Sequence, residues 1–446
     1  MTEETMRKLE KATAFVYPKL HHVFQFLAKQ GIAMAGNMLY GLLCVRMLPV
    51  PEYAKFAVLF GFMGSLTTLL DVGISGTLNP LVGGQISNLP LIANYVASIR
   101  KIALRLYLVV APIAAVVFIL LVRRQHWSVL VVGQMVVALL VTAWFARVSA
   151  AYGAVLILRR DRNRYYREQI IGSLGSLILL ILFWTFHRVN IYVGVLLNVA
   201  QILYLASRYY RRARELLGVE GQPSAAQEKN IVRLALPNAP STLFYAIQGQ
   251  IMLMLITVFG HNASSIANIG ALSRLGQILM VLGPMNAILV EPFFAKLERI
   301  RLRRIYVLSA GLVAAGLAVF SALAFLFPAA FLWILGPHYR QLGFEVGLVI
   351  LSSSIQYLGG FLWIIHSARR FVYWWVTIAN IFLVLVVEVL FIWKIDLSLM
   401  RNLLFLNIAT ALTSLAVNLS CGVYGFLRGG QTMHRPELRE GLESGA

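Results

Sequence analysis

Two arginines stand in the middle of segments that otherwise contain almost only apolar residues. Arg147 lies in VVALLVTAWFARVSAAYGAVLIL, and Arg274 lies in IANIGALSRLGQILMVLGPM. A charged side chain in the hydrocarbon core of a bilayer costs at least about 2.5–3.5 kcal/mol, so each arginine must face a water-filled cavity or a partner. A guanidinium binds phosphate groups through paired hydrogen bonds. Two such groups around one cavity predict an anion site.

The alternative for both arginines is an ion pair with a carboxylate. A rise of 1.5 Å per residue places Arg147 about 18 Å from the cytoplasmic end of its segment and Arg274 about 12 Å from the outer end of its own. Both positions are near the middle of a bilayer. The acidic residues in or beside apolar segments are Asp71, Glu291, Glu345 and Glu388. Only Glu388 lies away from a segment end, so we predict that both arginines face a cavity.

Uncharged and acidic polar residues add further candidates. Gln248 and Gln250 follow Pro237 and Pro240 in one segment, which predicts a kinked helix that presents amides to the cavity. Because they are two residues apart, at most one of them lines a path. Asn37 either lines the path or makes a hydrogen bond between helices.

Glu388 and Asp71 are the candidate coupling or gating residues, with a structural ion pair as the alternative for Glu388. The cysteines, Cys44 and Cys421, lack the spacing of metal ligands, so we expect no metal and no cofactor.

The elements that must position these residues are membrane spans. The chain has 446 residues, of which 59% are hydrophobic and 13% are charged. Its mean hydropathy is +0.76. Taking about 20 apolar residues as one crossing predicts twelve spans. They lie near residues 30–48, 54–73, 102–122, 127–158, 170–187, 189–207, 234–259, 266–290, 305–327, 342–366, 371–394 and 402–427.

The positive charges fix the predicted orientation. With the N-terminus in the cytoplasm, 29 of the 39 Lys and Arg residues fall on cytoplasmic segments and 8 on the opposite side. Arginine and lysine accumulate on cytoplasmic loops, so both termini are predicted to be cytoplasmic. The net charge of +21 therefore reflects topology and anionic lipids, and no nucleic-acid partner is expected.

A long polar segment divides the chain into two halves. We predict an N-terminal six-helix lobe at 1–207, a cytoplasmic linker at 208–233, a C-terminal six-helix lobe at 234–427 and a cytoplasmic tail at 428–446. The fold class is thus an all-α membrane protein with about twelve spans in two lobes around a central cavity. Two-lobed plans of this kind are common among secondary transporters. The loops contain no nucleotide-binding, zinc-protease or nucleophile-elbow motif, so the sequence does not indicate an enzyme.

Several segments then resemble a known family. CVRMLPVPEYAKFAVLFGFMGSLTTLLDVGIS at 44–75, with Asp71 and Gly73, is similar to the first two spans of the polysaccharide flippases. These belong to the multidrug/oligosaccharidyl-lipid/polysaccharide exporter superfamily. Weaker likenesses follow in order along the chain, at 158–180, 258–279 and 335–354. Two positions depart from the family pattern: Ala54 replaces a common glycine, and Gln248 and Gln250 stand where relatives often carry an acidic residue.

The resemblance implies an alternating-access transporter in the bacterial inner membrane. Its substrate would be a polyprenyl-diphosphate-linked oligosaccharide for surface polysaccharides such as lipopolysaccharide, and Arg147 and Arg274 would meet the diphosphate. A monomer is expected, with a polysaccharide polymerase and length-control proteins as partners besides membrane lipids. The alternatives are a cation-coupled multidrug antiporter of the same superfamily, a glycan polymerase or ligase, or a scaffold without transport. Arginines within the spans weigh against the multidrug antiporter, whose cationic drugs call for carboxylates there. Short outer loops weigh against the polymerase or ligase, which needs a large outer loop.

Overall fold

The computed structural model describes residues 28–260, 262–371 and 373–428, and this part of the chain is helical with short connections. The N-terminal lobe contains a helix at 28–47, α2 (Val50–Asp71), α4 (Leu89–Val122), α5 (Val129–Leu158), α6 (Arg162–Thr185) and α7 (Ile191–Leu217). The short elements η1 (Ser75–Thr77), α3 (Leu78–Val82) and η2 (Gly83–Gln85) join α2 to α4, and η3 (Arg123–Gln125) follows α4.

The C-terminal lobe begins after α8 (Ala225–Ala235) and η4 (Leu236–Asn238). Its first two spans are broken. They comprise α9 (Ala239–Gln248) and α10 (Ile251–Phe259), followed by α11 (Ala263–Gly276), η5 (Leu279–Leu282), α12 (Gly283–Met285), the π-helical η6 (Asn286–Val290) and α13 (Glu291–Lys296). The remaining elements are α14 (Arg299–Leu326), α15 (Pro328–Leu335), η7 (Pro337–Tyr339), α16 (Gly343–Ala368), α17 (Trp374–Lys394) and α18 (Met400–Arg428).

The predicted two-lobed membrane fold is confirmed. Within the described residues, nine helices are long and apolar enough to cross a bilayer, and the pair α9 and α10, bent by 50°, makes a tenth. The helix at 28–47 and the broken segment α11–α13 correspond to the other two predicted spans. The molecule is therefore a multi-pass membrane protein.

Local sequence explains where the helices start. Asn88, Ser128, Asn190 and Asn262 each stand just before a helix, and each side chain accepts a hydrogen bond from a backbone N–H of the first turn. The start of α4 at Leu89 corrects the prediction of residue 102. Asn88 and Pro90 suggest a loop, but they are a cap and a first-turn proline, both of which favour a helix start.

The predicted linker also contains ordered structure. α7 continues to Leu217, where Gly218 adopts φ +65 and ends the helix, and α8 follows within the same polar segment. Gln222 N donates to Asn94 Oδ1 at 2.8 Å, and Ser98 Oγ donates to Gln227 Oε1 at 3.1 Å. The linker is thus packed on α4 of the N-terminal lobe.

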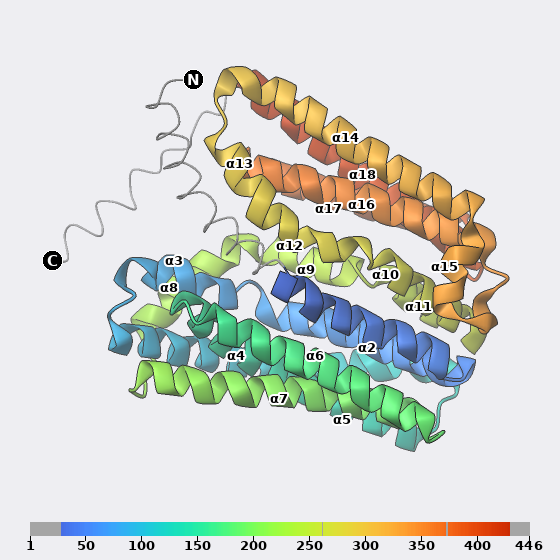
Figure 1. Cartoon of the computed structure of the whole chain (residues 1–446), viewed down its shortest axis with the longest axis horizontal. Helices are drawn as coiled ribbons and strands as arrows, with labels where there is room; N and C mark the ends of the chain where they lie inside the picture. The colour runs from blue at the N-terminus through green and yellow to red at the C-terminus, as the bar shows by residue number, and fades with distance from the viewer. Residues whose placement is uncertain (1–27, 261, 372, 429–446) are drawn as a thin grey trace, which may run out of the picture.

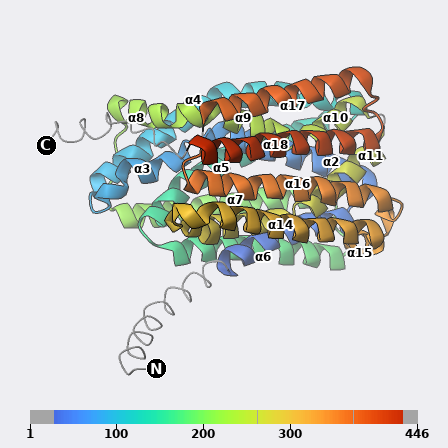
Figure 2. The same ribbon diagram turned by 90° about the horizontal axis from the view of Figure 1, so that it is seen from above.

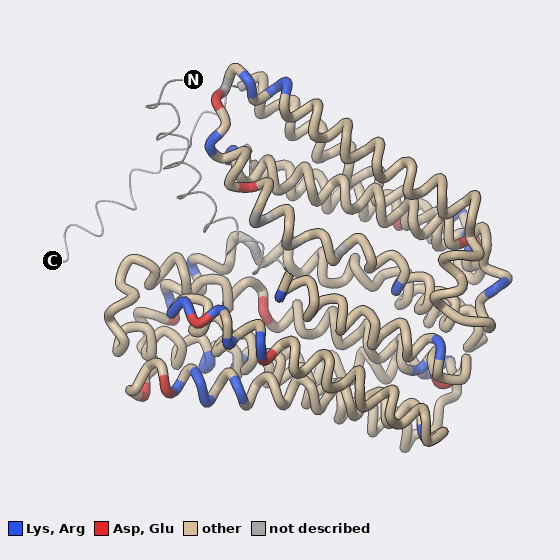
Figure 3. Tube along the Cα trace, in the orientation of Figure 1, with Lys and Arg blue, Asp and Glu red and all other residues tan. Residues whose placement is uncertain are grey.

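The two lobes lie side by side, and in Figure 1 they approach each other at the end that carries α15 and diverge toward the end that carries α3, α8 and α13. Many of the Lys and Arg residues gather at this second end (Figure 3), which we call the basic end, and the first we call the far end. Figure 2 shows α17, α18, α16 and α14 as one layer of the C-terminal lobe. α9 to α11 contact α2 of the N-terminal lobe.

Contacts at the far end hold the lobes together. Arg46 Nη1 donates to the Trp333 carbonyl at 3.4 Å, and Gln125 Nε2 donates to the Thr257 carbonyl at 2.9 Å. The rings of Tyr53 and Tyr339 meet edge to face with centroids 6.5 Å apart. The structure therefore has the shape of a two-lobed protein that is closed at the far end.

Candidate functional site

A cavity of about 300 Å³ lies between the lobes. α2, α5 and α7 of the N-terminal lobe form one side, and α10, α11 and the residues next to them form the other. Its polar lining consists of Thr67, Thr142, Asn198, Gln250, Ser273, Arg274 and Gln277. This set holds one cation and no carboxylate, so the cavity is electropositive.

Arg274 provides the charge of this cavity. It lies in the last turn of α11 and is 9% exposed. Its Nη1 donates to Gln277 Oε1 at 3.2 Å, and its guanidinium carbon lies 4.4 Å from the centroid of the Phe60 ring. Among the described residues, no carboxylate oxygen lies within 4.0 Å of the guanidinium nitrogens. Arg274 is thus a buried cation whose neighbours include a neutral amide, an aromatic face and the hydroxyl of Tyr53.

Glycines create the room around Arg274. A Cβ on Gly41 would lie 3.3 Å from three atoms of the Arg274 side chain, so the absence of a side chain lets Arg274 lie against the helix at 28–47. A Cβ on Gly270 would lie 2.6 Å from the Cβ of Ala57, which is closer than packed carbons approach. Gly270 therefore allows the close crossing of α2 and α11 that brings the two lobes around the cavity.

Arg147 lies elsewhere. It is 3% exposed, its Nη1 forms an ion pair with Asp71 Oδ1, and its Nη2 donates to Ser75 Oγ at 3.0 Å. It does not belong to the lining of the Arg274 cavity. The pair joins α5 to the end of α2 nearest the basic end.

The depth of Arg147 stays a prediction. Its partner Asp71 is the last residue of α2, a 22-residue helix that is about 33 Å long. Arg147 lies in the second half of α5, which has 30 residues.

The amides of the α9–α10 bend point to different places. Gln250 lines the Arg274 cavity, whereas Gln248 lies beside Glu388 of α17. Glu388 is 7% exposed, and its Oε1 has no hydrogen-bond partner among the described residues. The two glutamines of the bend thus lie next to different features: Gln248 next to the buried carboxylate of Glu388, and Gln250 at the cavity.

Asn37 belongs to a network between helices. Gln201 Nε2 donates to Asn37 Oδ1 at 2.8 Å, and Ser176 Oγ donates to Gln201 Oε1 at 3.1 Å. These contacts join the helix at 28–47 to α6 and α7. In this structure Asn37 does not line the Arg274 cavity.

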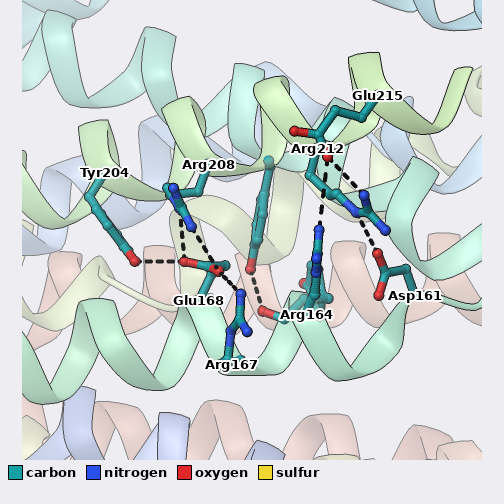
Figure 4. Close-up of polar contacts among 10 residues, drawn as sticks. Asp161, Arg164, Arg167, Glu168, Tyr204, Arg208, Arg212 and Glu215 are labelled. Atoms are coloured by element: carbon teal, nitrogen blue, oxygen red, sulfur yellow. Dashed lines mark hydrogen bonds and ion pairs between the residues drawn. The ribbon is translucent and has the colours of Figure 1, made fainter. Parts of the chain in front are cut away.

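A second polar network lies at the basic end of α6 and α7 (Figure 4). Glu168 accepts hydrogen bonds from Tyr204 at 2.6 Å, Arg167 at 2.9 Å and Arg208 at 3.1 Å. Arg212 Nε donates to Asp161 Oδ2 at 2.7 Å. Every charged member of this network has an opposite charge as partner, so it stabilises the helix pair. Arg274 differs, because it has no carboxylate partner among the described residues.

Sequence reasoning missed several lining residues of the cavity. Asn198 and Gln277 carry the signal that could have revealed them, because each is an amide inside an apolar span. Phe60 and Ser273 carry no such signal, since aromatic and small residues are common in spans. Their place in the site depends on how α2 crosses α11.

Comparison with known proteins gives the fold but no close relative. No protein-family model matches the chain, and no curated protein sequence matches it significantly. An inward-facing structure of a multidrug resistance MATE family transporter of the MOP superfamily matches with a TM-score of 0.66 and 14% identity, covering 90% of this chain and 94% of that one. An outward-facing MATE structure gives 0.55 and 16%, with coverage of 91% and 95%.

A mutant of the Vibrio cholerae MATE transporter VcmN gives a TM-score of 0.53 and 12% identity, with coverage of 89% and 95%. The chain therefore has the fold of MATE transporters over most of its length. Of these structures, the inward-facing one gives the higher TM-score.

Proposed function

We propose that this chain is a transporter that moves polyprenyl-diphosphate-linked oligosaccharide across the bacterial cytoplasmic membrane by alternating access. The observation that supports it is the position of Arg274, a buried cation in a cavity between the lobes without a carboxylate partner among the described residues. Such a charge needs an anion, and a diphosphate offers oxygens to both nitrogens of a guanidinium.

The size of the cavity fits the head group of such a substrate. At about 300 Å³ it lies at the lower end of the range of ligand pockets, about 300–1,000 Å³. It has room for a diphosphate and the sugar next to it. Gln250, Gln277 and Asn198 add amide groups for the sugar hydroxyls. The lipid tail and the rest of the glycan must lie outside this cavity.

In this proposal the basic end faces the cytoplasm, because loops rich in Lys and Arg are retained there. The structure then represents the inward-facing state. Substrate enters from the basic end, and the Arg147–Asp71 pair stands at the entrance as a gating element at the end of α2. We assign the anion role in this state to Arg274 alone. Glu388, beside the α9–α10 bend, is the proposed coupling residue.

A second candidate is a cation-coupled multidrug antiporter. The solved structures of the same fold include multidrug resistance transporters, and buried Glu388 could couple a cation to the movement. The lone cation in the cavity favours the anionic substrate, because a cationic drug would be repelled by Arg274.

The test is transport by the purified protein in liposomes. We expect the wild-type chain to flip a fluorescent polyprenyl-diphosphate oligosaccharide, and we expect Arg274→Gln to lose this activity at least tenfold. Arg188→Gln, which removes an exposed arginine at the α6–α7 turn, is the control and should be active. Transport of cationic dyes, with no movement of the lipid diphosphate, would support the antiporter and exclude our proposal.

A further inference from the structure

α16 exposes a polar and aromatic stripe within the membrane. Gln356 and Gly360 are exposed, and Trp363 is 38% exposed. Because a helix turns 100° per residue, Gln356 and Trp363, seven residues apart, lie within about 20° of each other. Gly360 lies between them along the helix axis, about 40–60° around from each, and a Cβ on it would meet nothing within 4 Å. The stripe is therefore an open surface with an amide at one end and an indole at the other.

This stripe is separate from the other large exposed side chain of α16. Phe344, 49% exposed, lies about 120° around the helix from Gln356 and about 100° from Trp363. On the other side of the stripe, Ser353 contacts Gly276 at the end of α11. Gly276 directly precedes Gln277 of the Arg274 cavity. The stripe thus starts one turn beyond the point where α16 touches the wall of the cavity.

An amide of α18 joins the stripe. Gln356 Nε2 donates to Asn407 Oδ1 and to Ser352 Oγ, each at 3.2 Å, and Asn407 Nδ2 also donates to Ser352. Asn407 lies on the side of α18 opposite the exposed Phe405 and Leu412. Among the described residues, Gln356 Oε1 accepts no hydrogen bond. The pair therefore offers an exposed acceptor to a ligand.

Bonds between helices account for only part of this arrangement. Amide and hydroxyl groups often join membrane helices, and the contact of Asn407 with Ser352 is of this kind. Such a role does not require an exposed acceptor, and it does not explain why an exposed Trp363 lies on the same side of α16. A saccharide needs both features, because its hydroxyls bind amides and its C–H face packs on an aromatic ring.

We propose that Gln356, Asn407 and Trp363 form a glycan-binding surface that takes the sugars following the diphosphate. This inference rests on the proposed function and adds the part of the path that recognises the saccharide. Arg274 would bind the diphosphate, which all lipid diphosphates share. The stripe on α16 would bind the sugars, which only a glycosylated lipid carries.

The experiment measures binding of two probes to the purified full chain in detergent. One is a polyprenyl diphosphate without sugar, and the other is the same lipid carrying a trisaccharide. The variant with Gln356→Leu and Asn407→Leu should bind the glycosylated lipid about tenfold more weakly, as expected for the loss of one or two hydrogen bonds, and should bind the bare lipid as the wild type does. Trp363→Leu should show the same selectivity.

Two controls separate this inference from the proposed function. Asn380→Leu removes an amide that bonds Tyr245 across α17 and α9 at 2.8 Å, and it should leave the ratio of the two affinities unchanged. Arg274→Gln should weaken both probes alike. Equal losses for both probes, or none, in the Gln356 and Trp363 variants would overturn the glycan surface. An Arg274→Gln variant with normal binding of both would overturn the proposed function instead.

Discussion

The guanidinium carbon of Arg274 lies 4.4 Å from the centre of the Phe60 ring, across the boundary between the two lobes. Arg274 belongs to α11 and Phe60 to α2, so this contact exists only while these helices cross closely. An aromatic face stabilises a cation without using its N–H groups. The contact therefore holds the guanidinium in place and does not occupy the N–H groups that Gln277 leaves available for an anion.

The first prediction tests this contact. Phe60→Leu should weaken binding of a polyprenyl diphosphate by about threefold to thirtyfold, which corresponds to the range of about 0.5–2 kcal/mol for a cation on an aromatic ring. Phe60→Trp should bind as well as the wild type or better. Titration of purified protein with the labelled lipid gives the dissociation constants. Phe405→Leu, on an exposed side of α18, is the control, and an equal loss there would show that the effect is general.

The second prediction concerns the Arg147–Asp71 pair. Asp71→Leu leaves Arg147, which is 3% exposed, without its carboxylate. We expect a loss of about 3 kcal/mol in the free energy of unfolding, at the lower end of the range for a broken buried pair because Asp71 is one-third exposed. Thermal unfolding in detergent measures it. The double variant Asp71→Leu with Arg147→Met removes both charges and should recover most of the loss; a double variant as unstable as the single one would argue against the pair.

Much of the fold follows from the sequence, because the spans are long apolar runs and polar loops separate them. Where the helices of the structure differ from the predicted spans, the difference has an identifiable cause. Asn88 and Pro90 can break a helix or start one, and only the packing of α4 against α5 and α8 decides between the two. The span containing Arg274 is broken into α11–α13, which its two prolines, Pro284 and Pro292, favour without fixing where each turn lies.

The site was harder to predict than the fold. The sequence singles out Arg147 and Arg274 equally, since each is a lone cation in an apolar run. Their difference depends on which helices meet at each position: α5 meets the end of α2, which brings Arg147 to Asp71. No local pattern records that contact. Arg274 has no carboxylate within reach in the described residues because α2, the nearest neighbour across the lobes, presents Phe60 there.

The third prediction concerns Glu388. Its buried Oε1 lacks a hydrogen bond in the described part of the chain, and Gln248 of the bent span lies beside it. If the charge of Glu388 couples an ion to the movement, Glu388→Gln should bind substrate normally but transport it at a rate that no longer responds to an imposed pH or sodium gradient. Liposomes with and without each gradient measure this response. A variant that responds as the wild type does would leave Glu388 with a structural role.

The fourth prediction concerns the docking of α8. Lys101 Nζ lies 2.8 Å from Glu228 Oε1 and Arg105 Nη1 lies 2.7 Å from Oε2. The hydrogen bond with Lys101, followed by the charge of Arg105, lowers the pKa of Glu228 below its ordinary value. Because the pKa is lowered in the docked state, the contribution of this group is complete above the ordinary glutamate pKa and is lost as the pH falls through the lowered one.

Acidification should therefore release α8 from α4. Hydrogen exchange of the amides at 225–235 should become faster as the pH falls through this range, after correction for the intrinsic rate. Glu228→Gln should show the faster exchange already at neutral pH. Glu215→Gln removes an exposed carboxylate from the α6–α7 network and should leave α8 unchanged. Exchange in α8 that is the same in both variants would contradict this account.

The last prediction concerns the crossing of α2 and α11. A side chain on Gly270 would collide with Ala57, because even a Cβ would lie 2.6 Å from the Cβ of that alanine. Gly270→Leu should therefore separate the helices where they bring Phe60 to Arg274, and it should favour a state in which the far end is open. We expect transport to fall at least tenfold and a cysteine placed at Tyr339, which is buried against Tyr53 of the other lobe, to become more reactive toward a membrane-impermeant thiol reagent. Gly316→Leu is the matched control, since a Cβ there would meet nothing within 4 Å. Normal transport in the Gly270 variant would show that alternating access does not require this crossing.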